Sequence, residues 1–215
     1  MQFNPKLNQD DSAPTPLNVV LVLTATINPG SMIDTKRNDP ELRLRDYSDA
    51  LKRWLTNSHF TKIVFCENSA SDLSQLKCLT EECASPDKQI EFLSFREIEF
   101  PEHKGKAYGE IGIIAHVLRE SELVRSATHI TKVTGRLFVS NTAKLTERYG
   151  KRSETHVFCN VGRNMTTAEC RIFGGQKAFF ENYLLAAREL CDEKHVYANG
   201  YSVGHYALAV SEWVK

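Results

Sequence analysis

Basic and polar side chains follow four short apolar segments of the chain, and their chemistry suits a ligand that carries phosphate. Lysine and arginine pair well with phosphate oxygens, while hydroxyl, amide and carboxylate groups can hydrogen-bond a ribose or a base. The residues concerned are Thr24, Thr26, Glu67, Asn68, Ser69, Lys104, Lys106, Lys132, Thr134 and Arg136. Together they indicate a site for a nucleotide-like molecule.

Several of these residues also fit a purely structural role. Lys104-Gly105-Lys106 suits either a solvated turn before a helix or a close backbone approach to phosphate. Glu67-Asn68-Ser69 suits either a strand-to-helix turn or a ribose contact. For Arg136 a functional role is favoured, because an arginine that follows a buried strand needs an anionic partner. Arg43 and Arg45 are expected to be charges on the solvated face of a helix.

Two further groups are candidates for acid–base chemistry. Glu169 lies two residues before Arg171, and the pair is either a structural salt bridge or part of a site. His205 opens an expected C-terminal helix, where it is either a cap-region residue or a base. The sequence has no P-loop, no Gly-x-Gly-x-x-Gly after the first apolar segment, no His-Glu-x-x-His and no Gly-x-Ser-x-Gly.

The elements that must position these residues alternate along the first two thirds of the chain. Apolar, β-branched runs predict strands, and apolar residues at helical spacing predict amphipathic helices. The expected strands are 17–27, 62–66, 90–95 and 128–134, and the expected helices are 40–55, 72–83 and 106–124. The last third adds a strand over 155–161 and helices near 176–190 and 201–213. Strands separated by helices predict a mainly parallel sheet, whose carboxyl edge gathers the polar residues.

Composition narrows the class of protein. The 215 residues include 27 Lys and Arg and 27 Asp and Glu, a balance that argues against a dedicated nucleic-acid binder. No apolar run approaches the length of a membrane span. The six cysteines show no Cys-x-x-Cys spacing and are expected to be reduced thiols in a cytoplasmic protein. Residues 1–16 are expected to be a disordered lead-in rather than a signal peptide, and residues 17–215 one α/β domain.

The strand ends resemble a known family. Residues 63–72, Ile-Val-Phe-Cys-Glu-Asn-Ser-Ala-Ser-Asp, resemble the second-strand segment of GT-A glycosyltransferases, in which the carboxylate contacts the nucleotide. The segment 104–110 resembles the one that runs alongside the donor, and 173–180 resembles the acceptor-side segment. The likeness covers roughly 17–213 and is greatest to small bacterial enzymes of surface-polysaccharide assembly. It implies a single GT-A-like, Rossmann-like domain.

The resemblance also implies roles for individual residues. Thr24, Thr26, Glu67 and Asn68 would face the nucleoside, and Lys104, Lys106, Lys132 and Arg136 the diphosphate. Arg171, Gly174 and Gly175 would lie on the acceptor side, with Glu169 as first and His205 as second candidate for the catalytic base. The acceptor would be a glycan or a lipid-linked molecule, and the protein could associate peripherally with the inner face of the membrane.

The chain departs from the family pattern where a metal-binding Asp-x-Asp would lie, since residues 132–136 read Lys-Val-Thr-Gly-Arg. No divalent metal or other cofactor is therefore expected, and Lys132 or Arg136 would neutralise the leaving diphosphate. Two alternatives stay open. One is a sugar nucleotidyltransferase, which would release pyrophosphate and need a metal. The other is a catalytically inactive GT-A-like domain that binds a nucleotide or a glycan.

Overall fold

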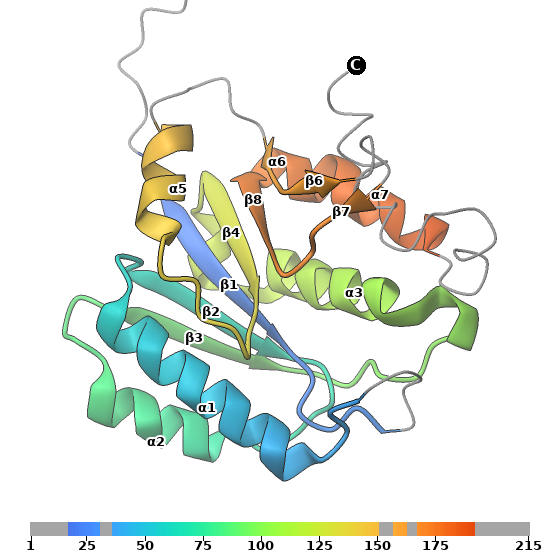
Figure 1. The fold of residues 1–215 in the computed structure, drawn as a ribbon, viewed down its shortest axis with the longest axis horizontal. Coiled ribbons are helices and arrows are strands. Elements are labelled where there is room, and N and C mark those ends of the chain that lie inside the picture. The colour runs from blue at the N-terminus through green and yellow to red at the C-terminus, as the bar shows by residue number, and fades with distance from the viewer. Residues whose placement is uncertain (1–16, 31–35, 151–156, 163–166, 192–215) are drawn as a thin grey trace, which may run out of the picture.

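Six strands form one sheet in the order β3-β2-β1-β4-β8-β5 (Figure 1). The computed structural model describes residues 17–30, 36–150, 157–162 and 167–191. The strands are β1 (Val19–Ala25), β2 (Lys62–Glu67), β3 (Gln89–Ser94), β4 (His129–Thr134), β5 (Val157–Phe158) and β8 (Ile172–Gln176). The pairs β1–β2, β1–β4 and β2–β3 are parallel, whereas β8 is antiparallel to β4 and to β5. The expectation of a mainly parallel α/β sheet is confirmed.

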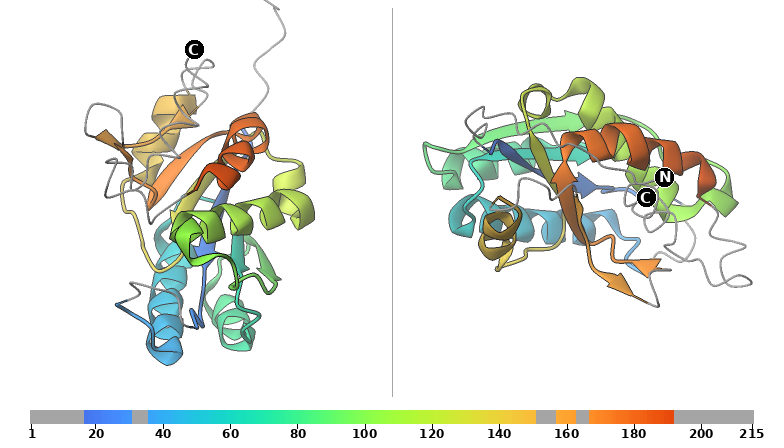
Figure 2. Two further views of the ribbon diagram at one scale, coloured as in Figure 1. Left: turned by 90° about the vertical axis from the view of Figure 1, so that its right-hand side faces the viewer. Right: turned by 90° about the horizontal axis from the view of Figure 1, so that it is seen from above.

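Helices cover both faces of this sheet (Figure 2). On one face lie α1 (Pro40–Asn57) and α2 (Ser74–Cys83), and on the other α3 (Gly105–Glu120) with a C-terminal run of helical turns. That run comprises α6 (Lys177–Phe179), η2 (Phe180–Leu184), α7 (Leu185–Ala187) and η3 (Arg188–Leu190). Consecutive side chains of β1 alternate between the two layers, because strand side chains point to opposite faces. Leu21 and Leu23 join the α1 side, and Val20 and Val22 the α3 side.

Local sequence explains where the main helices begin and end. The Asp39 carboxylate accepts from the Glu41 and Leu42 amides, and Pro40 occupies the first turn, where its missing N–H costs nothing. The helix expected over 106–124 is interrupted at Ser121, whose hydroxyl accepts from the Val124 amide and starts α4 (Glu122–Arg125). The apolar pattern runs on across this break, so periodicity alone does not reveal it.

The last third differs more from expectation. The strand expected over 155–161 is two short strands, β5 and β6 (Val161–Gly162), and β6 pairs with β7 (Thr167–Ala168) in a separate ribbon. Helix α5 (Thr142–Gly150) and the short helix η1 (Glu102–Lys104) were not expected. The lead-in at 1–16 and the helix expected over 201–213 lie outside the described residues. Within those residues no helix is both long and apolar enough to cross a membrane.

Candidate functional site

The sheet has a topological switch point between β1 and β4. The chain adds β2 and β3 on one side of β1 and then returns to place β4 on its other side (Figure 1). In open parallel sheets, ligands bind outside the carboxyl ends of the strands at such a point. Here the Gly135 amide donates to the Thr24 carbonyl at 2.8 Å. A Cβ at position 135 would lie 2.9 Å from that oxygen, so glycine lets the two strand ends approach.

Arg136 lies at the switch point with an exposed side chain. Beside it, Asp46 of α1 accepts two hydrogen bonds from Arg37, at 2.7 and 2.5 Å. These bonds hold the pKa of Asp46 below its usual range, and the charges of Arg136 and Arg43 lower it further. Three guanidinium groups thus raise the electrostatic potential around one carboxylate, and the exposed Arg136 can still be reached by an anion from solvent.

Arg43 supports the segment that follows β1. Only 8% of its surface is exposed. Its Nε donates to the Thr26 carbonyl at 2.6 Å, and its Nη2 donates to the Tyr47 hydroxyl at 3.1 Å. That hydroxyl also accepts from the Thr26 amide at 3.0 Å, and burial raises the pKa of Tyr47. The expectation of a solvated charge is therefore wrong for Arg43, whereas Arg45 is exposed as expected.

Lys132 is fully buried below the switch point. Its ammonium group forms an ion pair with Glu110 of α3 and donates to the Cys170 carbonyl at 2.6 Å and to the Thr134 hydroxyl at 3.4 Å. The Thr24 hydroxyl donates to the same Glu110 oxygen at 3.1 Å. Each of the three ammonium protons therefore has an acceptor within the protein. Lys132 can act on a ligand through its charge, but direct contact would require one of these bonds to open.

Glu67 and Asn68 lie at the end of β2, and both are buried. The carboxylate of Glu67 accepts hydrogen bonds from the residues after β1 and β2, among them the Ile27 amide at 3.0 Å. Asn68 accepts from the Thr26 hydroxyl at 2.6 Å and donates to the Glu97 carbonyl at 3.0 Å. The structure thus brings Thr26, Glu67 and Asn68 together at the predicted edge, with their polar groups engaged by neighbouring segments.

Lys104 and Lys106 flank Gly105 at the start of α3. Lys104 donates to the Glu189 carbonyl at 2.6 Å, and its ammonium lies 5.5 Å from the centre of the Tyr108 ring. This side chain therefore ties the start of α3 to η3. Lys106 is exposed. Gly105 has a φ of 68°, a conformation that glycine adopts without strain.

Glu169 and Arg171 form an ion pair next to the antiparallel strand β8. The hydrogen bond from Arg171 holds the pKa of Glu169 below its usual range, and the charge of Lys132 acts in the same direction. Glu169 is thus a carboxylate at neutral pH, able to accept a proton, although Arg171 makes it a weaker base. The expected salt bridge is therefore confirmed, and the role of Glu169 as a base stays a prediction.

The predicted acceptor-side glycines lie inside the sheet. Gly174 and Gly175 belong to β8, where they pair with β4 and β5. A Cβ at position 174 would lie 2.6 Å from the Ile130 carbonyl oxygen and against the Phe158 ring. Glycine is required there by close packing, an explanation that does not involve an acceptor. His205, the second candidate base, lies outside the described residues.

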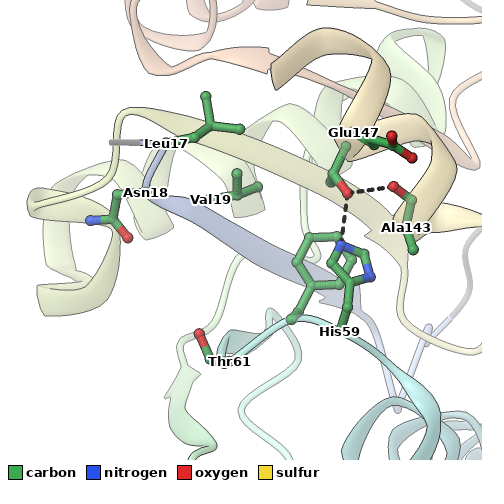
Figure 3. A pocket seen from close by; sticks show the side chains of 9 residues that line it. Leu17, Asn18, Val19, His59, Thr61, Ala143 and Glu147 are labelled. Atoms are coloured by element: carbon green, nitrogen blue, oxygen red, sulfur yellow. Dashed lines mark hydrogen bonds between the residues drawn. The ribbon is translucent and has the colours of Figure 1, made fainter. Parts of the chain in front are cut away.

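A cavity of about 460 Å³ opens near the amino ends of the strands, at the end of the sheet opposite the switch point (Figure 3). It is lined by the start of β1, the segment before β2 and helix α5. Within it the Thr146 hydroxyl lies 2.9 Å from Nε2 of His59. None of the residues predicted for the site lines this cavity. It belongs to the amino ends of the strands, so it is separate from the switch point.

Sequence reasoning missed Glu110, Arg43 and Tyr47 as parts of the carboxyl edge. Glu110 was detectable in principle, because it is three and four residues before Ile113 and Ile114 on the buried side of α3. Across the residues that the structure describes, no group of three or more His, Cys, Asp or Glu side chains is arranged to hold a metal ion. All six cysteines are free thiols, as expected.

No protein-family model matches the sequence, and no curated protein matches it. Solved structures with a similar fold include a cytidylyltransferase from Leptospira borgpetersenii, 11% identical, with a TM-score of 0.46 over 87% of this chain and 74% of that one. A protein from Desulfovibrio desulfuricans, assigned as a nucleotide-diphospho-sugar transferase, is 6% identical, with a TM-score of 0.48 over 91% and 75%.

A third similar structure is a mannosyltransferase from Pyrobaculum calidifontis in complex with GDP-Man and Mn²⁺. It is 14% identical, with a TM-score of 0.45 over 80% of this chain and 48% of that one. At such identities and TM-scores, these similarities assign neither a substrate nor a catalytic residue to the present chain.

Proposed function

We propose that the protein is a glycosyltransferase that moves a sugar from a nucleotide-sugar donor to a glycan or lipid-linked acceptor in bacterial surface-polysaccharide synthesis. The observation that carries the proposal is the exposed Arg136 at the β1–β4 switch point, with the buried Lys132 beneath it. Cations at this point suit the diphosphate of such a donor. The segments after β1 and β2 would flank the nucleoside.

The transfer we propose is a single displacement. The acceptor hydroxyl oxygen bonds to the anomeric carbon while the bond from that carbon to the diphosphate oxygen breaks, and the nucleoside diphosphate leaves. Arg136 would stabilise the negative charge that develops on the leaving group, with Lys132 adding its field from below. The hydroxyl proton would pass to a base, for which Glu169 is the first candidate and His205 the second.

Thermal unfolding in the presence of UDP-, GDP-, CMP- and dTDP-sugars tests donor binding, each with EDTA or with Mn²⁺. A ligand at 100 times its dissociation constant stabilises the folded state by about 2.7 kcal/mol, which raises Tm by several degrees. We expect one nucleotide class to do so, with or without EDTA. Arg136→Ala should abolish the shift, whereas Arg119→Ala, at the far end of α3, should leave it intact.

The product released on turnover distinguishes the alternatives. Glycosyl transfer releases a nucleoside diphosphate from the nucleotide-sugar. Pyrophosphate released from a nucleoside triphosphate and a sugar phosphate, and lost in EDTA, would assign a nucleotidyltransferase instead. Nucleotide binding without turnover on any acceptor would assign a binding domain. If no nucleotide or nucleotide-sugar raises Tm, the proposed function is wrong.

A further inference from the structure

We infer that Glu67 is a positioning residue, whose buried carboxylate holds the segments after β1 and β2 in the shape that receives the ligand. This differs from the ribose contact that the sequence suggests and from the nucleotide contact that the resemblance implies. The inference rests on the proposed function for the identity of the ligand only.

The donors around Glu67 come from both loops and from Ser94 at the end of β3. Its Oε1 accepts from the Ile27 amide at 3.0 Å, from the Ser69 amide at 2.8 Å and from the Ser69 hydroxyl. Its Oε2 accepts from the Ser71 amide at 3.1 Å and from the Ser94 hydroxyl at 3.5 Å. With five donors and no solvent exposure, the carboxylate has little capacity left for a ribose hydroxyl.

The hydrogen bonds continue outward from Glu67 into both loops. The Ser69 hydroxyl accepts from the Asn28 amide at 3.0 Å, and the Asn28 side chain accepts from the Gly30 amide at 3.1 Å. In the second loop, Ala70 has a φ of 53°, a left-handed conformation that costs free energy for a residue other than glycine. Bonds on both sides fix this shape, because Glu67 accepts from the Ser69 and Ser71 amides and the Phe95 carbonyl accepts from the Ala70 amide at 2.9 Å.

The substitution that tests this role is Glu67→Gln, which keeps the size of the side chain. Glutamine replaces one acceptor oxygen with an NH2 group, which cannot accept from the amides and hydroxyls that face it. A hydrogen bond to a charged group contributes a factor of about ten or more to a local equilibrium. We therefore expect amide hydrogen exchange to speed up about tenfold or more at Ile27, Asn28, Ser69 and Ser71, and to stay unchanged at Val22.

Binding of the nucleotide found in the thermal screen separates positioning from contact. If Glu67 is a positioning residue, Glu67→Gln should weaken binding of the ribonucleotide and of its 2′- and 3′-deoxy forms by the same factor, because the carboxylate does not touch the hydroxyls. If Glu67 contacts a ribose hydroxyl, the variant should lose less affinity for the deoxy form that lacks this hydroxyl than for the ribonucleotide, because that interaction is already missing. A tenfold difference between the affinity loss for the ribonucleotide and the loss for either deoxy form would overturn the inference.

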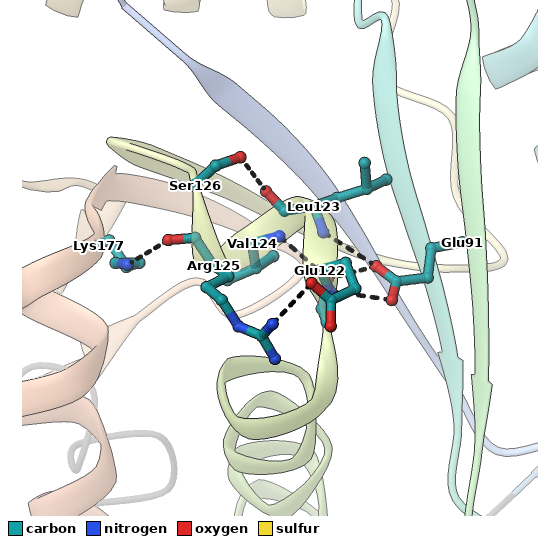
Figure 4. Close-up of polar contacts among 8 residues, drawn as sticks. Glu91, Glu122, Leu123, Val124, Arg125, Ser126 and Lys177 are labelled. Carbon is teal, nitrogen blue, oxygen red and sulfur yellow. Dashed lines mark hydrogen bonds and ion pairs between the residues drawn. The ribbon is translucent and has the colours of Figure 1, made fainter.

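Glu91→Gln is the matched control. The Glu91 carboxylate on β3 also accepts several hydrogen bonds, from the Ser121 hydroxyl at 2.5 Å and from the Glu122 and Leu123 amides at 3.0 and 3.3 Å (Figure 4). These bonds fix the start of α4 rather than the carboxyl-edge loops. We expect this variant to loosen α4 and to leave nucleotide affinity unchanged. Equal loss of affinity in both variants would show a global effect and contradict the inference.

A milder variant covers the case in which Glu67→Gln does not fold. Ser69→Ala removes the hydroxyl that joins Glu67 to the Asn28 amide and leaves the carboxylate in place. This variant should speed amide hydrogen exchange at Asn28 and weaken nucleotide binding, again by the same factor for the ribo and deoxy forms. If no nucleotide binds the wild-type protein, the proposed function fails, and the exchange measurements still decide whether Glu67 holds the loops.

Discussion

At the scale of single residues, several charged side chains of the carboxyl edge are already paired within the protein, whereas Arg136 is exposed to solvent. The buried Lys132 has Glu110, and Glu169 has Arg171. Residue types at strand ends could be predicted from sequence, because each follows an apolar run. Their partners could not, since Glu110 is 22 residues from Lys132 and meets it only when α3 packs on the sheet.

The buried Lys132–Glu110 pair predicts an asymmetric response to substitution. Glu110→Gln should cost about 3–5 kcal/mol of unfolding free energy, because it leaves the fully buried Lys132 ammonium without its ion-pair partner. Lys132→Met combined with Glu110→Gln should recover much of that loss, since the uncompensated charge is gone. Urea unfolding of the single and double variants measures this. A double variant as unstable as the sum of the singles would contradict it.

The Glu169–Arg171 pair predicts a pH dependence with a definite sign. Because the native pKa of Glu169 is lowered, the pair stabilises the fold at pH values above the unfolded pKa, and this contribution is lost as the pH falls through the native pKa. Arg171→Ala should raise the pKa of Glu169 toward its ordinary value. If Glu169 is the base, the acidic limb of the pH–rate profile should move up with it.

Carboxyl-carbon NMR of Glu169 follows this titration directly. Arg125→Ala is the control, since Arg125 pairs with Glu122 of α4 and not with the carboxyl edge. An unchanged Glu169 titration in Arg171→Ala would contradict the assigned cause of the shift. A shifted titration with an unchanged pH–rate profile would remove Glu169 from the role of base.

At the scale of elements, the main strands and helices up to β4 were predictable, and so was the helical run over 177–190, whereas α5 and β8 were not. The first four strands are apolar and β-branched, and α1 to α3 carry apolar residues at helical spacing, so hydrophobic burial decides both. Helix α5 is short and largely polar, and β8 has two glycines at its centre, so neither has enough apolar residues to be recognised from sequence. The β8 strand forms because its glycines allow close packing against β4 and Phe158.

Two glycines test this packing argument. In Gly174→Ala, the new Cβ would meet the Ile130 backbone carbonyl, which cannot move without distorting the sheet, so we expect a loss of roughly 1–3 kcal/mol or more. In Gly112→Ala, it would meet only the ends of the Glu97 and Arg188 side chains, which can swing away. Alanine is also a better helix former than glycine by about 1 kcal/mol. Gly112→Ala should therefore lose clearly less stability than Gly174→Ala in thermal unfolding. Equal losses in the two variants would contradict this account.

At the scale of the whole molecule, β1 joins the two layers. Its side chains contribute to both apolar clusters, one against α1 and α2 and the other against α3 and the C-terminal turns. Because the same strand also carries Thr24 to the switch point, the geometry of the proposed site depends on both layers. The two clusters are therefore expected to unfold together, as one cooperative unit.

Core truncations on opposite faces test that cooperativity. Leu23→Ala opens the α1 side and Ile114→Ala the α3 side, and each should cost about 2–5 kcal/mol, since both side chains are buried. In a Trp213→Phe background, fluorescence reports on Trp54 alone, which packs in the α1-side cluster. Ile114→Ala should still shift the midpoint of the Trp54 fluorescence transition by as much as the midpoint followed by far-UV circular dichroism, because both layers unfold in one transition.

The double variant should lose the sum of the two single costs, because the side chains lie on opposite faces of the sheet and share no direct contact. A Trp54 transition that stays in place in Ile114→Ala, while circular dichroism moves, would show that the layers unfold separately. The switch point would then keep β1 and α1 while losing α3, and with it the Glu110 that pairs with Lys132. Nucleotide binding would in that case fail at denaturant concentrations where Trp54 is still buried.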